Sequence, residues 1–239
     1  MELTPQEREL CERVGFDKAV AQRLKAVTEH AIEQAFCYDY EIEPEPENAL
    51  SCATDAAYPN LETVRAELPD DYRAYIGIRR EPNGLEIGPE IVVLRDTDPL
   101  AFVRCRRPDG ANYHISAKDV LAKLEDWHAR FGLDIVRADH DQVEMNFQSL
   151  PADLMAFAEE VFWFCEDVTD VEGDEMDIER DPDLLARARE LSDVSPAFRA
   201  RYNEQMREAF DDYDLGEAIG LKLLAAQLER ERNLFLWWD

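Results

Sequence analysis

The stretch SAKDVLAKLEDWHARFGLDIVRADHDQVEMNF, residues 116–147, decides the fold, because it predicts a helix followed by a two-stranded hairpin. Ser116 is typical of a residue that caps the start of a helix, and Gly132 is typical of one that ends it. Between them, apolar residues recur at the spacing of one helix face: Val120, Leu121, Leu124, Trp127 and Phe131. The pattern predicts an amphipathic helix packed against a core.

Two strands are predicted directly after that helix. Residues 133–136, LDIV, form a short apolar run, and residues 143–147, VEMNF, alternate as a half-buried strand does. The polar residues 138–141, ADHD, lie between them and are typical of a turn. The local order is therefore helix, strand, strand.

Further elements of the same kind lie on both sides of this region. Residues 72–78 alternate like a strand, residues 90–94 form a short apolar strand, and a second amphipathic helix begins at Pro151. The last residues, 234–239, read LFLWWD; they are apolar on both faces and predict a central strand covered on both sides. The order favours an α+β fold with a split βαβ, ferredoxin-like, antiparallel or mixed sheet and helices on one face.

The remaining segments are predicted to be mainly helical. Residues 1–70 form a helical N-terminal region, interrupted by the proline- and glutamate-rich residues 41–48, which we expect to be a surface loop. Residues 71–239 form the α+β domain. An insertion at residues 166–232 begins acidic and continues as helices around residues 184–191, 196–210 and 215–230.

The net charge is the most informative property of the composition. The 239 residues include 26 lysines and arginines against 54 aspartates and glutamates, for a formal charge of −28. Such a chain repels nucleic-acid phosphates and anionic membranes. It attracts a basic protein by speeding the encounter. The alternative is that the charge serves solubility alone. The hydrophobic fraction of 46% is normal for a folded protein.

The cysteines and the N-terminus indicate a cytoplasmic protein. An odd number of cysteines without a CxxC pair favours reduced, mostly buried thiols over a disulfide framework: Cys11, Cys37, Cys52, Cys105 and Cys165. The first residues, MELTPQEREL, lack the basic and apolar regions of a secretion signal, and no apolar run reaches membrane-spanning length. We expect no membrane partner.

Several short motifs occur together in this chain: GANY at 110–113, LEDW at 124–127, LPADL at 150–154, FAEE at 157–160, FC at 164–165 and LFLWWD at 234–239. Over roughly residues 90–168 and 220–239 they resemble the bacterial DUF4253 family, which has no assigned activity. After Cys165 the chain departs from the Pro-Asp of that family, so the resemblance implies nothing about the insertion. Proteins of this type resemble the small acidic companions of bacterial toxin genes.

The C-terminal Trp237-Trp238-Asp239 is the most unusual feature of the sequence. A carboxylate beside two indoles could anchor a partner protein, because tryptophan is a frequent hot-spot residue. We therefore take Trp238 and Asp239 as candidate partner-binding residues. The alternative is that the final strand completes the sheet and buries its aromatic side chains.

The acidic start of the insertion supplies the other candidate partner-binding residues: Asp167, Asp170, Glu172, Asp174, Glu175 and Asp177. A calcium loop is excluded there, because placing Gly173 at position 6 puts Val168 at position 1, where an oxygen ligand is needed. No zinc spacing and no phosphate-binding glycine loop occurs in the sequence. We predict no metal and no cofactor.

Two pairs of residues could carry catalysis. Asp139-His140-Asp141 places a histidine between carboxylates, although Asp and His are also ordinary turn residues. His114 could activate Cys105, but the spacing supplies no orienting third group. The sequence therefore predicts no catalytic residues.

Two hypotheses follow. The first is an acidic protein-binding module, an immunity-type protein that neutralises a cognate toxin encoded nearby by occluding its active site. Asp and Glu side chains would meet the Lys and Arg of a basic partner. The alternative is a small intracellular enzyme of unknown reaction that uses the Cys105–His114 or the Asp139–His140 pair.

Overall fold

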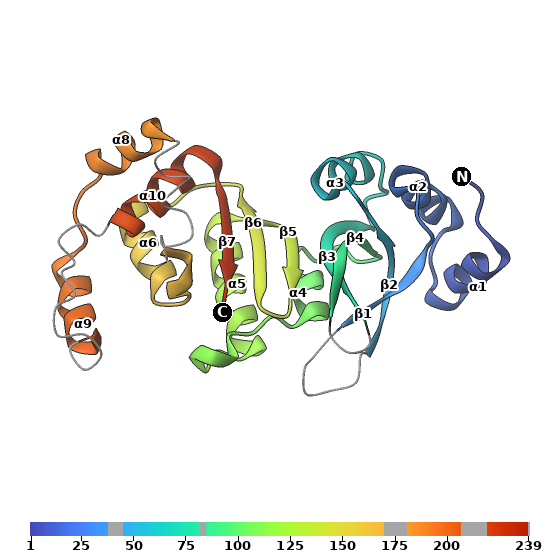
Figure 1. The fold of residues 1–239 in the computed structure, drawn as a ribbon, viewed down its shortest axis with the longest axis horizontal. Coiled ribbons are helices and arrows are strands. Elements are labelled where there is room, and N and C mark those ends of the chain that lie inside the picture. Colours follow the sequence, from blue (N-terminus) through green and yellow to red (C-terminus); the bar gives the residue numbers. More distant parts are fainter. Residues whose placement is uncertain (38–44, 82–84, 170–180, 207–218, 239) are drawn as a thin grey trace.

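A computed structural model describes residues 1–37, 45–81, 85–169, 181–206 and 219–238 (Figure 1). Its centre is a seven-stranded sheet in the order β1-β2-β4-β3-β5-β6-β7. All neighbouring strands are antiparallel except β3 and β5, which are parallel. The strands are β1 Glu33–Cys37, β2 Glu45–Ala53, β3 Arg73–Arg80, β4 Glu86–Leu94, β5 Leu133–Asp139, β6 Gln142–Phe147 and β7 Asn233–Trp237. The predicted α+β class with a mixed sheet is confirmed.

Helices flank the sheet along its whole length. They are α1 Pro5–Val14, α2 Lys18–Thr28, α3 Ala57–Arg65, α4 Ala101–Arg106, α5 Ala117–Phe131, α6 Leu154–Phe162, α8 Pro182–Glu190, α9 Pro196–Met206 and α10 Ile219–Glu231, with short 3-10 turns η1 Ala111–Tyr113 and η2 Glu166–Thr169. The start of α5 is the predicted cap: the Ser116 side chain accepts from the Asp119 backbone, and Asp119 accepts from the Ser116 backbone.

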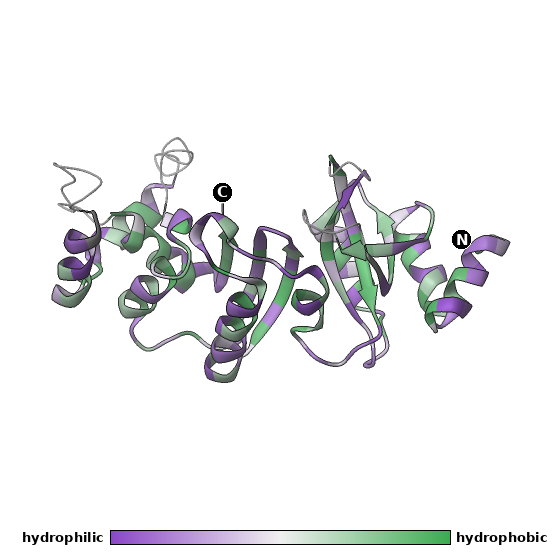
Figure 2. Ribbon diagram, turned by 90° about the horizontal axis from the view of Figure 1, so that it is seen from below, coloured by the Kyte–Doolittle hydropathy of each residue, from purple (hydrophilic) through white to green (hydrophobic). Residues whose placement is uncertain are grey.

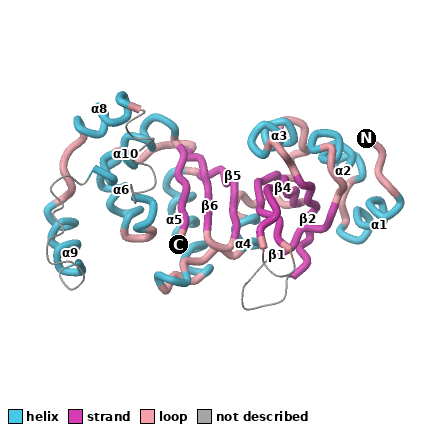
Figure 3. Tube along the Cα trace, in the orientation of Figure 1, coloured by secondary structure: helices cyan, strands magenta, loops and turns pink. Residues whose placement is uncertain are grey.

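The described helices lie on both faces of the sheet, not on one face as predicted (Figure 3). The second half of β4 shows why, because residues 90–94 are buried whichever way they point. Ile91 and Val93 pack with α1, α2 and α3, whereas Val92 and Leu94 pack with α4 and α5 on the opposite side. A strand buried on both faces reads as an unbroken apolar run, as IVVL at 91–94 does.

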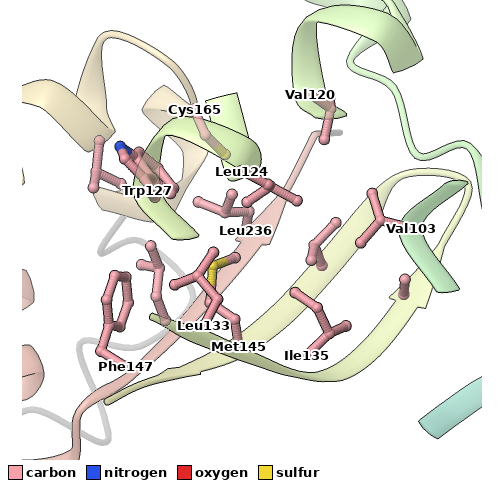
Figure 4. Close-up of a cluster of buried hydrophobic side chains, with 14 of the residues drawn as sticks. Val103, Val120, Leu124, Trp127, Leu133, Ile135, Met145, Phe147, Cys165 and Leu236 are labelled. Atoms are coloured by element: carbon pink, nitrogen blue, oxygen red, sulfur yellow. The ribbon is translucent and has the colours of Figure 1, made fainter. Parts of the chain in front are cut away.

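The larger core lies between α4, α5 and α6 and the strands β5, β6 and β7 (Figure 4). Leu133, Ile135 and Met145 point from the sheet toward Val120, Leu124 and Trp127 of α5: this is the stripe expected from the sequence. The indole nitrogen of Trp127 donates to Glu160 Oε1 at 2.8 Å. Apolar positions are green on the core sides of these elements in Figure 2.

The terminal strand β7 lies at the edge of the sheet, so the prediction of a central, doubly covered strand is wrong. Leu234 and Leu236 are buried on the core side, whereas Phe235 and Trp237 are half-buried on the other face. The strands β5, β6 and β7 are adjacent in chain order. The parallel strands β3 and β5 are direct neighbours, so the split arrangement of a ferredoxin-like sheet, with a strand inserted between the two parallel ones, is not formed.

Residues 1–70 are not a purely helical region, because β1 and β2 lie within them and extend the same sheet. The predicted loop at 41–48 is wrong from residue 45 onward, where β2 begins; residues 41–44 lie outside the described part. The apolar residues that build β2 follow the acidic start of the strand, and Leu50 and Cys52 are fully buried. The strand β2 was not predicted because its first residues are polar, as those of a loop are.

Candidate functional site

Charged side chains are buried together where β2, β3, β4 and β5 meet the end of α4. This buried charge cluster consists of Glu47, Arg80, Glu90, Arg106, Asp139 and His140. Arg106 is only 2% exposed and Arg80 only 6%. Burying an ion costs several kcal/mol unless it is paired and hydrogen-bonded, so such a cluster is the part of the interior least explained by packing.

Arg106 connects the sheet to α4. Its Nη2 donates to Glu90 Oε1 at 2.6 Å, and its Nη1 donates to the Phe36 carbonyl at 2.6 Å. Gly77 leaves the room for this pair, since a Cβ at that position would lie 2.9 Å from Glu90 Oε1. Burial lowers the pKa of Arg106, but the charges of Glu90 and Glu47 raise it by more, so the pKa is raised overall and the guanidinium stays charged.

Glu47 reaches the cluster through a bulge. Residues 47–49 of β2 oppose the single residue Ala35 of β1, and bulges of this kind redirect side chains. The Glu47 carboxylate lies 3.9 Å from Arg106 Nε, and neither of its oxygens has a hydrogen-bond partner in the described chain. Burial therefore raises the pKa of Glu47.

Arg80 lies at a second bulge, where Ile87 of β4 is the extra residue opposite Arg79 and Arg80 of β3. Its Nη2 contacts Asp139 Oδ2, lies 2.9 Å from His140 Nδ1 and pairs with Glu86 at 2.9 Å. Burial raises the pKa of Asp139, but the bonds from His140 and Arg80 outweigh it and lower that pKa overall. Asp139 is therefore ionised and neutralises Arg80.

His140 lies between two carboxylates. Its Nδ1 is 3.4 Å from Asp139 Oδ2, and its Nε2 is 3.0 Å from Asp141 Oδ2. Burial lowers the pKa of His140, but the two carboxylates raise it more strongly, to about 9. The imidazole is consequently a cation at neutral pH and a member of the ion-pair network.

The three residues Asp139, His140 and Asp141 bring ligand atoms within 4.8 Å of one another, which is close enough to hold a metal ion. The guanidinium of Arg80, however, lies against Asp139 and His140 at the same place. A cation already fills the space between these donors. The geometry is that of an ion-pair network and does not favour a metal site.

The Cys105–His114 pair is not joined by any hydrogen bond in the described residues. Burial raises the pKa of the Cys105 thiol to about 12, so it remains protonated at neutral pH. His114 follows η1 in a left-handed backbone conformation, with φ of 58°. These two residues do not form the thiolate–imidazole arrangement that a nucleophilic site requires.

Trp238 is buried, with 4% of its surface exposed, so its side chain belongs to the core of this chain, and its contact with a partner stays a prediction. Its ring packs edge-on against Phe164 at 5.6 Å, and its nitrogen donates to the Phe164 carbonyl. The alternative interpretation, burial in the completed sheet, is correct for this side chain. Trp237 is half-buried and stacks on Phe235.

Gly110 is expected to be required for this packing, because a Cβ there would lie 2.7 Å from Trp238 Cδ1. We expect Gly110→Ala to lower the free energy of unfolding by about 1–3 kcal/mol, measured by urea denaturation. In the double variant with Trp238→Phe, the smaller ring relieves the clash. The free energy of unfolding should therefore fall by less in the double variant than the sum of the falls in the two single variants. Strict additivity would contradict the contact.

The acidic candidate residues are only partly within the described chain. Asp167 in η2 is half-buried and accepts a hydrogen bond from the Tyr113 hydroxyl, which ties η2 to η1. Burial and this carboxylate raise the pKa of Tyr113. The others lie outside the described residues: Asp170, Glu172, Asp174, Glu175, Asp177 and Asp239.

A pocket of about 360 Å³ borders the buried charge cluster. It opens over the sheet formed by β1, β2, β4 and β3, whose strands are close together in Figure 1. Its lining includes two members of the cluster and is otherwise drawn from the same strands: Glu33, Gln34, Phe36, Ser51, Arg79, Arg80, Ile87 and Glu90. The sequence pointed to Asp139 and His140 but not to the rest of the cluster or to the pocket; a further signal was the charged residue Glu90 at the start of an apolar strand.

The fold and the cluster thus define a mixed-sheet α+β protein with a charged interior and no described helix long and apolar enough to cross a membrane. A family model for a domain of unknown function, DUF4253, matches residues 90–239, which is more than half of the chain. The chain therefore belongs to the DUF4253 family, and the resemblance noted in its sequence is confirmed. The matched region begins in β4 and includes the insertion at residues 166–232. No curated protein and no solved structure matches the chain.

Proposed function

We propose that this chain is an acidic protein-binding module of the immunity type, which acts in the bacterial cytoplasm. In this proposal it neutralises a cognate toxin, encoded nearby, by occluding the active site of that toxin. The observation that carries the proposal is the net charge of −28 on a chain with a well-packed core. Such a charge opposes compactness and is most useful when another molecule neutralises it.

The cations of this chain do not offset the surplus, because many are already paired with its own carboxylates. On the surface, Lys18 pairs with Glu12 at 2.7 Å, and Arg187 pairs with Glu229 at 2.6 Å. In the interior, Arg80 and Arg106 are paired within the buried charge cluster. Since 54 acidic residues face 26 basic ones in the sequence, carboxylates remain in surplus even if every cation is paired, and this surplus can meet a basic partner.

Acidic residues are dense in the sequence of the insertion. Residues 170–180 contain Asp170, Glu172, Asp174, Glu175, Asp177 and Glu179 against one arginine, Arg180. In the proposed mechanism, these acids meet lysines and arginines that a toxin uses to hold an anionic substrate. Association is then fast and sensitive to salt, because long-range attraction steers the encounter.

A small enzyme is the second candidate, and one observation favours it: Asp139 and His140 are in contact beside a pocket. Two features weigh against it. The pKa of His140 is about 9, too high for a base at neutral pH, and both ring nitrogens already face carboxylates. The binding role is therefore the better supported of the two.

The proposal is tested by the rate at which the chain binds the product of the flanking gene. Four neutral replacements, Asp167→Asn, Asp170→Asn, Glu172→Gln and Asp174→Asn, are expected to lower the association rate at low salt about tenfold or more. The matched control neutralises four exposed carboxylates elsewhere: Glu2, Glu9, Glu62 and Asp70. Equal losses in both variants would contradict a role for the insertion, and absence of binding by the native chain would contradict the proposed function.

A further inference from the structure

The floor of the pocket between β1, β2, β4 and β3 is formed by two buried polar side chains. Ser51 of β2 is 2% exposed, and Glu90 of β4 is 4% exposed. Both side chains line the pocket, and they come from adjacent strands, where Ser51 is paired with Val92. Buried polar groups normally have hydrogen-bond partners, so acceptor capacity that is left over on this floor points to a ligand.

Each of these side chains has hydrogen-bonding capacity left over. Glu90 uses Oε1 to accept from Arg106, while its Oε2 accepts no hydrogen bond from the described residues. The Ser51 hydroxyl likewise has no hydrogen-bond partner among them. Both residues line the pocket, so these oxygens are open to a ligand there, and a group that donates hydrogen bonds can use their free acceptor capacity.

The walls of the pocket decide which donor fits. Phe36 and Ile87 supply apolar surface, and Ile87 is 48% exposed. The two arginines in the lining are already neutralised: Arg79 pairs with Glu33 at 2.8 Å, and Arg80 pairs with Asp139 and Glu86. The charges of both arginines are thus balanced, and Glu90 Oε2 and Ser51 Oγ offer acceptors below an apolar wall, in a chain whose overall field attracts cations.

We propose that this pocket binds a single cationic nitrogen group, a guanidinium or an ammonium, carried on an apolar stem. The charged group donates to Glu90 Oε2 and Ser51 Oγ, and the stem packs against Phe36 and Ile87. A volume of about 360 Å³ lies at the lower end of ligand pockets and suits a group the size of one long side chain. The site goes beyond the proposed function and does not depend on it.

A pair of matched small molecules tests this chemistry. Butylguanidine carries the cation, and butylurea has the same shape without charge. Titration calorimetry at about 150 mM salt, where unspecific attraction is screened, should show butylguanidine binding with a dissociation constant on the order of 1 mM or tighter. Butylurea should bind at least about tenfold more weakly, because it lacks a charged donor for Glu90. Equal binding of the two, or none at all, would overturn the proposal.

Two variants locate the binding. Ser51→Leu fills the floor and should abolish butylguanidine binding, whereas Cys52→Ala, whose side chain belongs to the core on the other sheet face, should leave it unchanged. Glu33→Gln alters only the exposed rim of the pocket, so it still tests the site if Ser51→Leu does not fold. It should weaken butylguanidine binding about twofold to fivefold, because the attraction between the Glu33 carboxylate and the cation is lost. Native-like binding by both rim and floor variants would place the ligand elsewhere and overturn the assignment.

The cation can come from a free amine or guanidine, or from a lysine or arginine of a bound protein. Acetyl-Gly-Arg-Gly-amide and its citrulline counterpart distinguish these sources. If the arginine peptide binds at least as tightly as butylguanidine, a protein side chain is the source. If only butylguanidine binds, the source is a small molecule, and the pocket chemistry still stands. Loss of toxin binding in the flanking-gene experiment would leave these results unaffected.

Discussion

Replacing Arg106 with alanine is expected to lower the free energy of unfolding by about 3–5 kcal/mol, a large fraction of the total for a domain of this size. The guanidinium is held between Glu90 and Glu47, with the Phe36 carbonyl on its other side. Without it, two buried carboxylates remain without a counter-charge. The free energy of unfolding falls mainly because these two carboxylates are buried without a partner, and less because the contacts of the arginine itself are removed.

Urea denaturation of two companion variants separates these causes. Arg104→Ala, on the exposed side of α4, removes a surface ion pair with Glu125 and should cost less than about 1 kcal/mol. The double variant Arg106→Met with Glu90→Met removes the principal buried pair and should recover at least half of the loss. A loss in Arg106→Ala no larger than in Arg104→Ala would show that the cluster is not buried as described.

The second large effect is a dependence of stability on pH that resides in His140. Its pKa is about 9 in the folded chain, against an ordinary value of 6.5, so the folded state holds the proton more tightly than the unfolded state. The resulting stabilisation is fully present below pH about 6.5 and is lost as the pH rises through about 9. At about 1.4 kcal/mol per pH unit, the difference is about 3 kcal/mol.

The comparison of the native chain with His140→Gln measures this contribution. Between pH 6 and 10 the native chain should lose about 3 kcal/mol more than the variant, because glutamine has no proton to release. His30→Gln, which makes the same substitution at a partly exposed histidine, is the matched control. Parallel curves for the native chain and His140→Gln would contradict the raised pKa of His140.

The sequence predicted the elements whose signals are local. The capping box at Ser116, the apolar stripe through Trp127 and the hairpin after Gly132 are all properties of neighbouring residues, and all were found. The position of β7 could not be predicted in this way. An apolar strand reads the same at the centre of a sheet and at an edge whose faces are covered by aromatic packing.

The buried charge cluster was beyond local inference because its members are far apart in the chain. Glu47 and Arg80 both lie at bulges, whose extra residues are in β2 and β4, and bulges of this kind redirect side chains. Asp139 and His140 were singled out, but as a turn or an acid–base pair, and the arginine that fixes their role is some sixty residues earlier. Partners of this kind become visible only when the sheet is assembled.

Survival of cells that produce the flanking gene product tests the proposed function most directly. Co-expression of the native chain is expected to restore growth, and the variant with Asp167, Asp170, Glu172 and Asp174 neutralised should restore less of it at the same protein level. Cells that die equally with and without the chain, although it is folded and abundant, would contradict the view that its surplus carboxylates exist to meet a basic toxin.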